Sequence, residues 1–207
     1  MKGGFSPETL SHKTYRLSDC AGKTATRHGC GSHAPFRAWA GVCRAESYFV
    51  LTEVTFTDLG LSGPLLKALE VEKYTHPTPI QAQAIPLLLE GRDLFGLAQT
   101  GTGKTAAFTL PLLQRLNKDQ KQPGRNGVRA LILAPTRELA VQIGDSIRAY
   151  SHFCSIRHTV ITGGVPQGRQ VKAMARGVDI LVATPGRLLD LINQRHVDLH
   201  SAQTFIL

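Results

Sequence analysis

The stretch "DLFGLAQTGTGKTAAFTLPLLQRL", residues 93–116, decides the fold. Its first part, residues 93–98, predicts an apolar strand, residues 99–103 predict a glycine-rich turn, and residues 104–116 have the pattern of a helix. A strand, a glycine-rich turn and a helix that starts with Lys-Thr form the context that a phosphate-binding loop requires. We therefore predict a phosphate-binding loop here; the alternative is a glycine-rich turn without a ligand.

The residues of this loop have separate roles in holding phosphate. Gly101 and Gly103 let backbone N–H groups approach phosphate oxygens without a clashing Cβ, and the following helix points its positive end at the anion. Lys104 supplies a full charge, and the Thr105 hydroxyl is a suitable ligand for Mg²⁺. The predicted phosphate-binding residues are Gln99, Thr100, Gly101, Thr102, Gly103, Lys104, Thr105 and Ala106, of which Lys104 and Thr105 are the candidate catalytic residues. The general pattern has glycine where Ala98 stands, and alanine is small enough to serve.

The base is predicted to be adenine rather than guanine. Proteins that bind GTP recognise guanine with Asn-Lys-x-Asp, and the nearest match, "NKDQ" at 117–120, ends in Gln120 and follows the first helix too closely. Gln81 in "YTHPTPIQ", residues 74–81, has an amide that can both donate and accept, as the N6 and N7 positions of adenine require. Phe56 lies upstream and could stack on the base. Alone these two residues assign no base, because most such residues belong to the core or the surface; ATP with Mg²⁺ is the expected cofactor only when they are taken together with the other motifs of the chain.

The rest of the chain from residue 53 alternates apolar runs with helical patterns. Two helices, at 61–70 and 78–91, come first, and Ser62 is the expected cap of the earlier one. Strands are predicted at 129–134, 158–163, 179–183 and 203–207, and helices at 136–151, 167–176 and 186–194. Strands that are apolar throughout and separated by helices predict an α/β fold with a mostly parallel sheet between helices.

The amino-acid composition limits the kinds of binding partner that are expected. A net charge of +9 over 207 residues favours a polyanion, and nucleic acid more than membrane. No run of 18 apolar residues predicts a membrane span, and the first ten residues lack the apolar centre of a secretory signal. A cytoplasmic location is the resulting expectation.

Residues 1–52 differ from the remainder. They carry seven Lys/Arg against three Asp/Glu and lack apolar periodicity until their end, so we expect them to be poorly ordered. Cys20, Cys30 and Cys43 are ten and thirteen residues apart, which disfavours a zinc site because zinc ligands come in closely spaced pairs. We expect a start codon assigned too far upstream, with the true protein beginning near Leu51; an organelle transit peptide is the alternative.

Further motifs give a family resemblance over residues 54–207. They are "PTRELA" at 135–140, "GG" at 163–164 and "TPGR" at 184–187, which follow "YTHPTPIQ" and "AQTGTGKT" in this order. Together they resemble the DEAD-box ATP-dependent RNA helicases, and the running text is most similar to the bacterial RhlE-type members. The resemblance implies a RecA-like domain that binds ATP and RNA and, in the complete protein, unwinds RNA duplexes.

The resemblance also implies roles for individual residues. The adenine site would consist of Phe56, Thr75, Pro77, Thr78 and Gln81. The RNA-binding residues would be Pro135, Thr136, Arg137, Gly163, Gly164, Thr184, Gly186 and Arg187. Arg137 and Arg187 stand at predicted helix starts, where side-chain charge and backbone N–H groups both favour phosphate. Contacts to phosphate carry no base preference, so recognition of single-stranded or duplex RNA would be independent of sequence.

The chain departs from the family pattern at its end, because "QTFIL" stops at Leu207, where relatives continue into Asp-Glu-Ala-Asp. The resemblance implies that the acidic pair which helps to hold Mg²⁺ and to orient the attacking water is missing, together with a second RecA-like domain. None of Asp58, Asp179 and Asp190 has the context to substitute. We therefore expect these 207 residues alone to bind ATP without hydrolysing it, and the strand at 93–98 to expose apolar faces and an unpaired edge. The alternative is a complete non-catalytic module that binds ATP or RNA.

Overall fold

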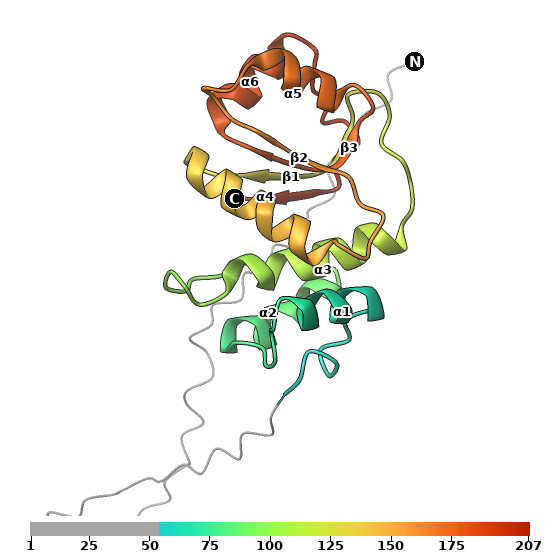
Figure 1. Cartoon of the computed structure of the whole chain (residues 1–207), viewed down its shortest axis with the longest axis vertical. Helices are drawn as coiled ribbons and strands as arrows, with labels where there is room; N and C mark the ends of the chain where they lie inside the picture. Colours follow the sequence, from blue (N-terminus) through green and yellow to red (C-terminus); the bar gives the residue numbers. More distant parts are fainter. Residues whose placement is uncertain (1–53) are drawn as a thin grey trace, which may run out of the picture. The chain divides into compact units, whose positions relative to one another are not determined.

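A computed structural model describes residues 54–207 of the chain, so the expectations for residues 1–52 lie outside the described residues. The centre of the described part is a sheet whose three strand pairs are all parallel, in the order β2-β3-β1-β4 (Figure 1). The strands are β1 (Val128–Leu133), β2 (His158–Ile161), β3 (Val178–Ala183) and β4 (Thr204–Ile206). The predicted parallel α/β fold is confirmed.

Helices occupy the intervals between the strands and precede the sheet. They are α1 (Gly63–Val71), α2 (Pro79–Leu89), α3 (Lys104–Lys118), α4 (Arg137–Tyr150), α5 (Gln167–Met174) and α6 (Pro185–Asn193). Each agrees with a predicted helix to within a few residues. Ser62 is in the N-cap position of α1 as expected, but its side chain makes no capping hydrogen bond. Its backbone N–H instead donates to the Gln114 side chain on α3, at 2.7 Å.

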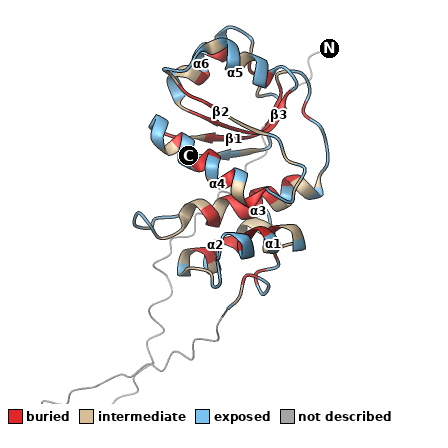
Figure 2. Ribbon diagram, viewed as in Figure 1, coloured by how far each residue is buried: buried red, intermediate tan, exposed pale blue. Residues whose placement is uncertain are grey.

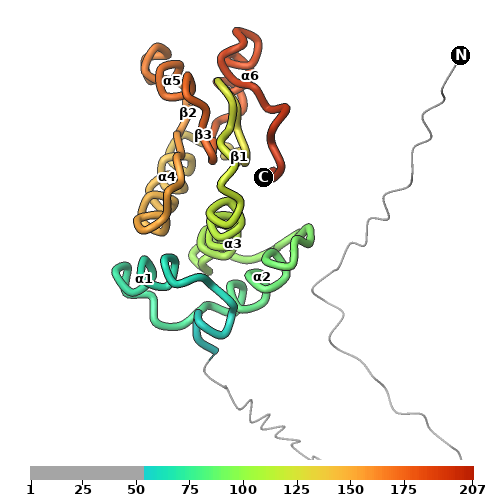
Figure 3. Tube along the Cα trace, turned by 90° about the vertical axis from the view of Figure 1, so that its right-hand side faces the viewer, coloured from blue at the N-terminus to red at the C-terminus, as the bar shows by residue number. Residues whose placement is uncertain are grey.

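The sheet separates two apolar cores because alternate strand residues point to opposite faces. Ala130 and Ile132 of β1 pack with residues of α3 and α4, whereas Leu131 packs with residues of α5 and α6. Figure 2 shows the buried positions following the strands and the inner sides of these helices. Helices α1 and α2 lie against α3 on the side away from the strands, as Figure 3 shows, and extend the first core through Leu65 and Ile85. The glycine-rich loop stands at the N-terminal end of α3, where Thr78 and Gln81, at the start of α2, bond to its backbone.

The strand predicted at residues 93–98 is absent, and this prediction was wrong. The segment has no regular structure, and Phe95 and Leu97 are 74% and 76% exposed. A strand needs a hydrogen-bonding neighbour, and the strand order leaves this segment beside none of the four described strands. The outer edge of β4 also has no neighbour among residues 54–207, and Phe205 is 56% exposed. The expected exposure of apolar side chains in residues 93–98 is confirmed, whereas the expected unpaired strand edge is not found because the segment forms no strand.

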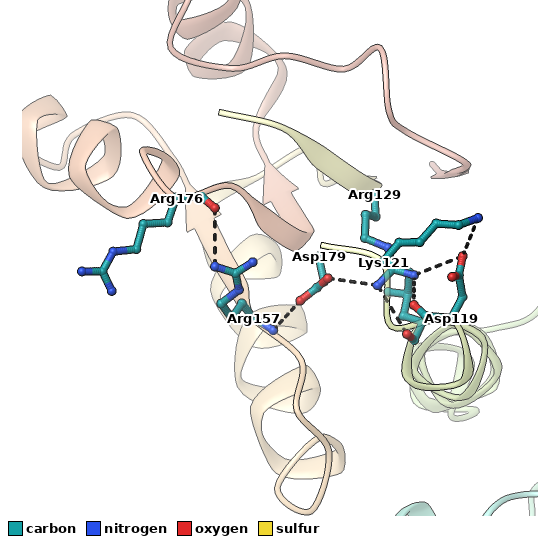
Figure 4. Close-up of polar contacts among 7 residues, drawn as sticks. Asp119, Lys121, Arg129, Arg157, Arg176 and Asp179 are labelled. Carbon is teal, nitrogen blue, oxygen red and sulfur yellow. Dashed lines mark hydrogen bonds and ion pairs between the residues drawn. The ribbon is translucent and has the colours of Figure 1, made fainter. Parts of the chain in front are cut away.

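A buried ion pair fixes the far end of α3 to the sheet (Figure 4). Arg129 of β1 and Asp179 of β3 are 3.1 Å apart, and both side chains are more than nine-tenths buried. Arg129 also donates to the Leu116 carbonyl of α3 at 3.3 Å, and Asp179 accepts from the Arg157 backbone at 2.9 Å. Because α3 begins at the phosphate loop, this contact helps to set the position of the loop relative to the strands.

Candidate nucleotide and RNA site

The predicted phosphate loop has the backbone that its glycines were expected to allow. Gly101 and Gly103 have φ angles of +81° and +86°, a region that L-residues with a Cβ rarely adopt. Gly103 is the N-cap of α3, and no side chain caps the first turn of this helix. The N–H groups of that turn therefore remain suited to an anion.

Lys104 and Thr105 open α3 at the edge of this loop. The Lys104 ammonium donates to the carbonyl oxygens of Ala98 and Gln99, the latter at 2.6 Å, so the charge is held within the loop. Thr105 follows it and is half-buried. No group of three or more His, Cys, Asp or Glu side chains within residues 54–207 could hold a metal ion. The residues present fit phosphate groups and a Mg²⁺ that takes most of its ligands from phosphate and water, as Mg²⁺ usually does.

The predicted adenine loop is joined directly to the phosphate loop. Gln81 is fully buried; its Oε1 accepts from the Thr78 backbone at 3.0 Å, and its Nε2 donates to the Gly103 carbonyl at 3.1 Å. The Thr78 hydroxyl donates to the Thr102 carbonyl at 2.8 Å. A glutamine amide has two N–H donors and two acceptor lone pairs, so one of each remains after these bonds. The structure thus brings Gln81 and Thr78 to the site and gives both a role in shaping the phosphate loop.

The other predicted adenine residues are less close together. Phe56 is 4% exposed and lies in the core, edge-on to Tyr74 with ring centroids 6.5 Å apart. Thr75 is exposed and Pro77 half-buried. Stacking of Phe56 on a base stays a prediction.

Two tyrosines that the sequence did not single out connect this region to α4. Tyr74 packs edge-on against Tyr150, with centroids 5.9 Å apart, and the two hydroxyls are 3.1 Å apart. Burial, and then the hydrogen bond with Tyr74, raise the pKa of Tyr150 above its ordinary value. The adenine loop is therefore attached to the helix that carries Arg137 at its other end.

The predicted RNA-binding residues meet in one pocket of about 470 Å³ at the carboxyl ends of β1, β2 and β3. Pro135, Thr136, Arg137, Glu138, Gly163, Thr184, Gly186 and Arg187 line this pocket. All predicted RNA-binding residues except Gly164 are among them, and Glu138 is an addition that the sequence did not indicate. Three motifs far apart in the chain thus form one surface, which we call the motif pocket.

Arg137 and the glycine pair are packed directly against each other. A Cβ built on Gly163 would lie 3.1 Å from Nη2 of Arg137, and one built on Gly164 would overlap its Nη1. Gly164 also has a φ angle of +78°. Arg137 is the first residue of α4, and the preceding Thr136 caps this helix by accepting from the Leu139 backbone at 3.2 Å. The glycines therefore make room for the guanidinium at the positive end of a helix.

Arg187 approaches the same pocket from α6. Its Nη1 donates to the Val165 carbonyl at 3.2 Å and to the side-chain oxygen of Gln170 at 3.3 Å. The Asp190 carboxylate is 4.0 Å from its Nε and is largely exposed. Both predicted RNA-binding arginines thus point to the turn that contains the glycine pair.

Comparison with known proteins decides the family. The sequence model of the DEAD/DEAH box helicases matches residues 78–207. The chain belongs to the DEAD/DEAH box helicase family. The "ATP-dependent RNA helicase DeaD" of Escherichia coli (strain K12) is 47% identical over 156 residues, which are 75% of this chain and 24% of that protein. The protein of the same name from Klebsiella pneumoniae is 45% identical over the same shares.

This helicase-family chain spans about a quarter of the length of the curated relatives that it matches. The matched region contains the phosphate loop, the motif pocket and all strands of the sheet. The resemblance to RhlE-type members in particular stays a prediction. Within residues 54–207, no helix is long and apolar enough to cross a membrane.

Proposed function

We propose that this chain is the ATP-binding and RNA-binding part of an ATP-dependent RNA helicase. The motif pocket carries the proposal, because two arginines at helix starts and the glycine pair converge there from three different strand ends. Cationic side chains beside helix N-termini suit the phosphates of a nucleic acid. The name of the relatives, ATP-dependent RNA helicase, supports RNA as the polymer.

The nucleotide would be ATP with Mg²⁺, held by residues 99–106. The chemistry that ATP supplies is phosphoryl transfer, which depends on positioning and on stabilisation of charge. Lys104 would provide charge to the phosphates, and Thr105 an oxygen ligand to Mg²⁺. Thr78 and Gln81 would keep the loop in shape through their bonds to Thr102 and Gly103. Recognition of adenine by the remaining donor and acceptor of Gln81 would require the loop to open, because Gln81 is fully buried.

RNA would lie across the motif pocket with its phosphates near Arg137 and Arg187. Recognition through phosphate is independent of base sequence, so single-stranded and duplex RNA of many sequences would bind. A cytoplasmic location stays a prediction.

A second candidate, a module that binds ATP and RNA without turnover, has one observation in its favour. Two of the carboxylates considered from the sequence are engaged elsewhere: Asp179 pairs with Arg129, and Asp58 accepts from Thr55 at 2.8 Å. Asp190 lies on α6 near Arg187, away from the phosphate loop. We therefore expect that these 207 residues on their own bind Mg²⁺·ATP and do not hydrolyse it.

The test of the proposed function is the salt dependence of RNA binding. The full chain would be titrated with a fluorescent oligouridylate at several KCl concentrations, alongside Arg137→Ala and the matched control Arg148→Ala. Arg148 is on the same helix, is 76% exposed and lies outside the motif pocket. Loss of one phosphate contact should lower the slope of log K against log salt by about 0.7 for Arg137→Ala only. Equal slopes for all three proteins would contradict RNA binding in the motif pocket.

A further inference from the structure

Gln170 is a buried polar side chain that the assigned motifs do not explain. It lies on α5, outside the motifs at 163–164 and 184–187, and is 5% exposed. Its Nε2 donates to the Thr162 carbonyl at 2.8 Å, and its Oε1 accepts from Nη1 of Arg187 at 3.3 Å. Buried amides are usually retained for their hydrogen bonds, because an unpaired one is costly. Gln170 therefore joins two RNA-binding motifs through opposite ends of one side chain.

The first end of this bridge fixes the glycine pair. Thr162 is 5% exposed and immediately precedes Gly163, so the bond to its carbonyl holds the chain where it turns toward Arg137. The same turn supplies the Val165 carbonyl, which accepts from Arg187 at 3.2 Å. The turn and the arginine thus share Gln170 as a common support.

The second end orients Arg187 without cancelling its charge. Nη1 is occupied by two neutral oxygens, those of Gln170 and Val165, whereas Nη2 takes no part in these bonds. Within residues 54–207, Asp190 is the acid that pairs with the guanidinium; it is 4.0 Å away and 64% exposed, so water screens its effect. A carboxylate in place of the Gln170 amide would form a charge-assisted pair and compete with phosphate for the guanidinium.

We propose that Gln170 is the positioning residue for Arg187: it holds the guanidinium in a fixed orientation, with its charge available to an RNA phosphate. This inference rests on the proposed function, since it assumes that RNA binds in the motif pocket. A fixed arginine fork loses less side-chain freedom on binding than a mobile one.

The experiment measures oligouridylate binding by the full chain across KCl concentrations. Arg187→Ala should lower the salt slope by about 0.7, and Gln170→Met should weaken binding by about fivefold. In the Arg187→Ala background, Gln170→Met should cost less than about twofold more, because residues that act through one another are not additive. Gln170→Glu should lower the slope as Arg187→Ala does. The control Gln167→Met, one turn earlier on α5 and bonded to Gln194 rather than to Arg187, should bind as the unchanged chain does.

A variant that leaves the core untouched keeps the test decisive if Gln170 variants fail to fold. Arg187→Lys keeps the charge but cannot form a fork, so it should bind RNA nearly as weakly as Arg187→Ala. Binding by Arg187→Lys equal to that of the unchanged chain, additive losses in the double variant, or an unchanged slope for Gln170→Glu would overturn the role of Gln170 and leave the proposed function standing. No RNA binding by the unchanged chain, or no effect of Arg187→Ala, would overturn the proposed function and this inference with it.

Discussion

The guanidinium of Arg137 occupies the space that a side chain at Gly164 would fill: a Cβ there would overlap Nη1 and lie 3.1 Å from Cζ. The glycine is therefore required by the arginine next to it as well as by its own φ angle of +78°. This relationship links the glycine motif to the Arg137 motif sterically.

Gly164→Ala should displace Arg137 and weaken RNA binding about fivefold, with a destabilisation of about 1 kcal/mol from the positive φ angle. Gly168→Ala is the matched control, because a Cβ at Gly168 meets nothing within 4 Å and its φ angle is ordinary. RNA titration and thermal melting of both variants are the measurements. Equal RNA affinity of the Gly164→Ala and Gly168→Ala proteins would show that the packing of Gly164 against Arg137 does not affect RNA binding.

Gln81→Ala should leave the Thr78 N–H and the Gly103 carbonyl without their buried partners, which costs about 1–3 kcal/mol in unfolding free energy. It should also remove the preference for ATP over GTP, because the amide that would bond the adenine edge and leave a guanine edge unpaired is lost. Gln83→Ala, an exposed position on the same helix, should change neither property. Melting curves and competition of GTP against labelled ATP test this, and strong competition by GTP in the unchanged chain would contradict the adenine assignment.

Lys104→Ala should reduce Mg²⁺·ATP affinity by about tenfold or more, because the phosphates lose a charged partner in the loop. Lys118→Ala, at the other end of α3, is the control of equal charge change. Isothermal titration of the full chain gives the affinities, and a phosphate-release assay should show no hydrolysis by the unchanged chain. Measurable hydrolysis would mean that a carboxylate within these 207 residues positions the attacking water.

Asp179→Asn should lower the unfolding free energy by about 3 kcal/mol, since the buried Arg129 charge loses its buried partner and keeps only the Asp119 carboxylate, 3.6 Å away and partly exposed. The exposed pair of Arg92 and Glu90 provides the comparison, and Glu90→Gln should cost less than about 1 kcal/mol. Urea unfolding measures both. If Asp179→Asn lowered the unfolding free energy as little as Glu90→Gln does, the claim that the buried ion pair fixes α3 to the sheet would be contradicted.

His158 of β2 makes stability depend on pH. Burial, and then the nearby charge of Arg148, lower the pKa of His158 from its usual 6.5, while Asp145 and the Gly144 backbone oppose this shift. Near pH 6.5 the histidine is therefore protonated more readily in the unfolded chain than in the folded chain. As a result, the free energy of unfolding falls as the pH drops below about 6.5. His158→Gln should remove this part of the pH dependence, and His152→Gln, an exposed position, should not. Identical pH dependence of the two variants would contradict the assignment.

Most of the fold could be predicted because its elements carry local signals. The apolar runs of β1 and β3 and the cap, glycine and proline positions of the helices are all properties of neighbouring residues. The segment at 93–98 carries the same signal but forms no strand, because pairing depends on a neighbour that sequence periodicity cannot supply. Local pattern thus indicated its apolar character correctly and its conformation wrongly.

The site divides in the same way. Lys104, Arg137 and Arg187 belong to short motifs that the sequence displays, and their roles stay predictions, whereas Gln170 and Tyr150 make contacts with residues distant in sequence that no short motif indicates. Arg129 and Asp179 carried a usable signal, since each is the single charge in an apolar strand and the register Val128↔Val178 makes them neighbours. The strand order and register that make them neighbours come from the structure, so the sequence indicates two buried unlike charges and does not by itself pair them.

The measurement that tests the central claim most directly is hydrogen–deuterium exchange of the full chain with oligouridylate and with Mg²⁺·ATP, each added separately. RNA should slow exchange at residues 135–139, 163–165 and 184–188, and ATP should slow it at 99–106. Protection by RNA that is confined to other segments, or no protection by either ligand at concentrations where it binds, would contradict an ATP-binding and RNA-binding domain built on these motifs.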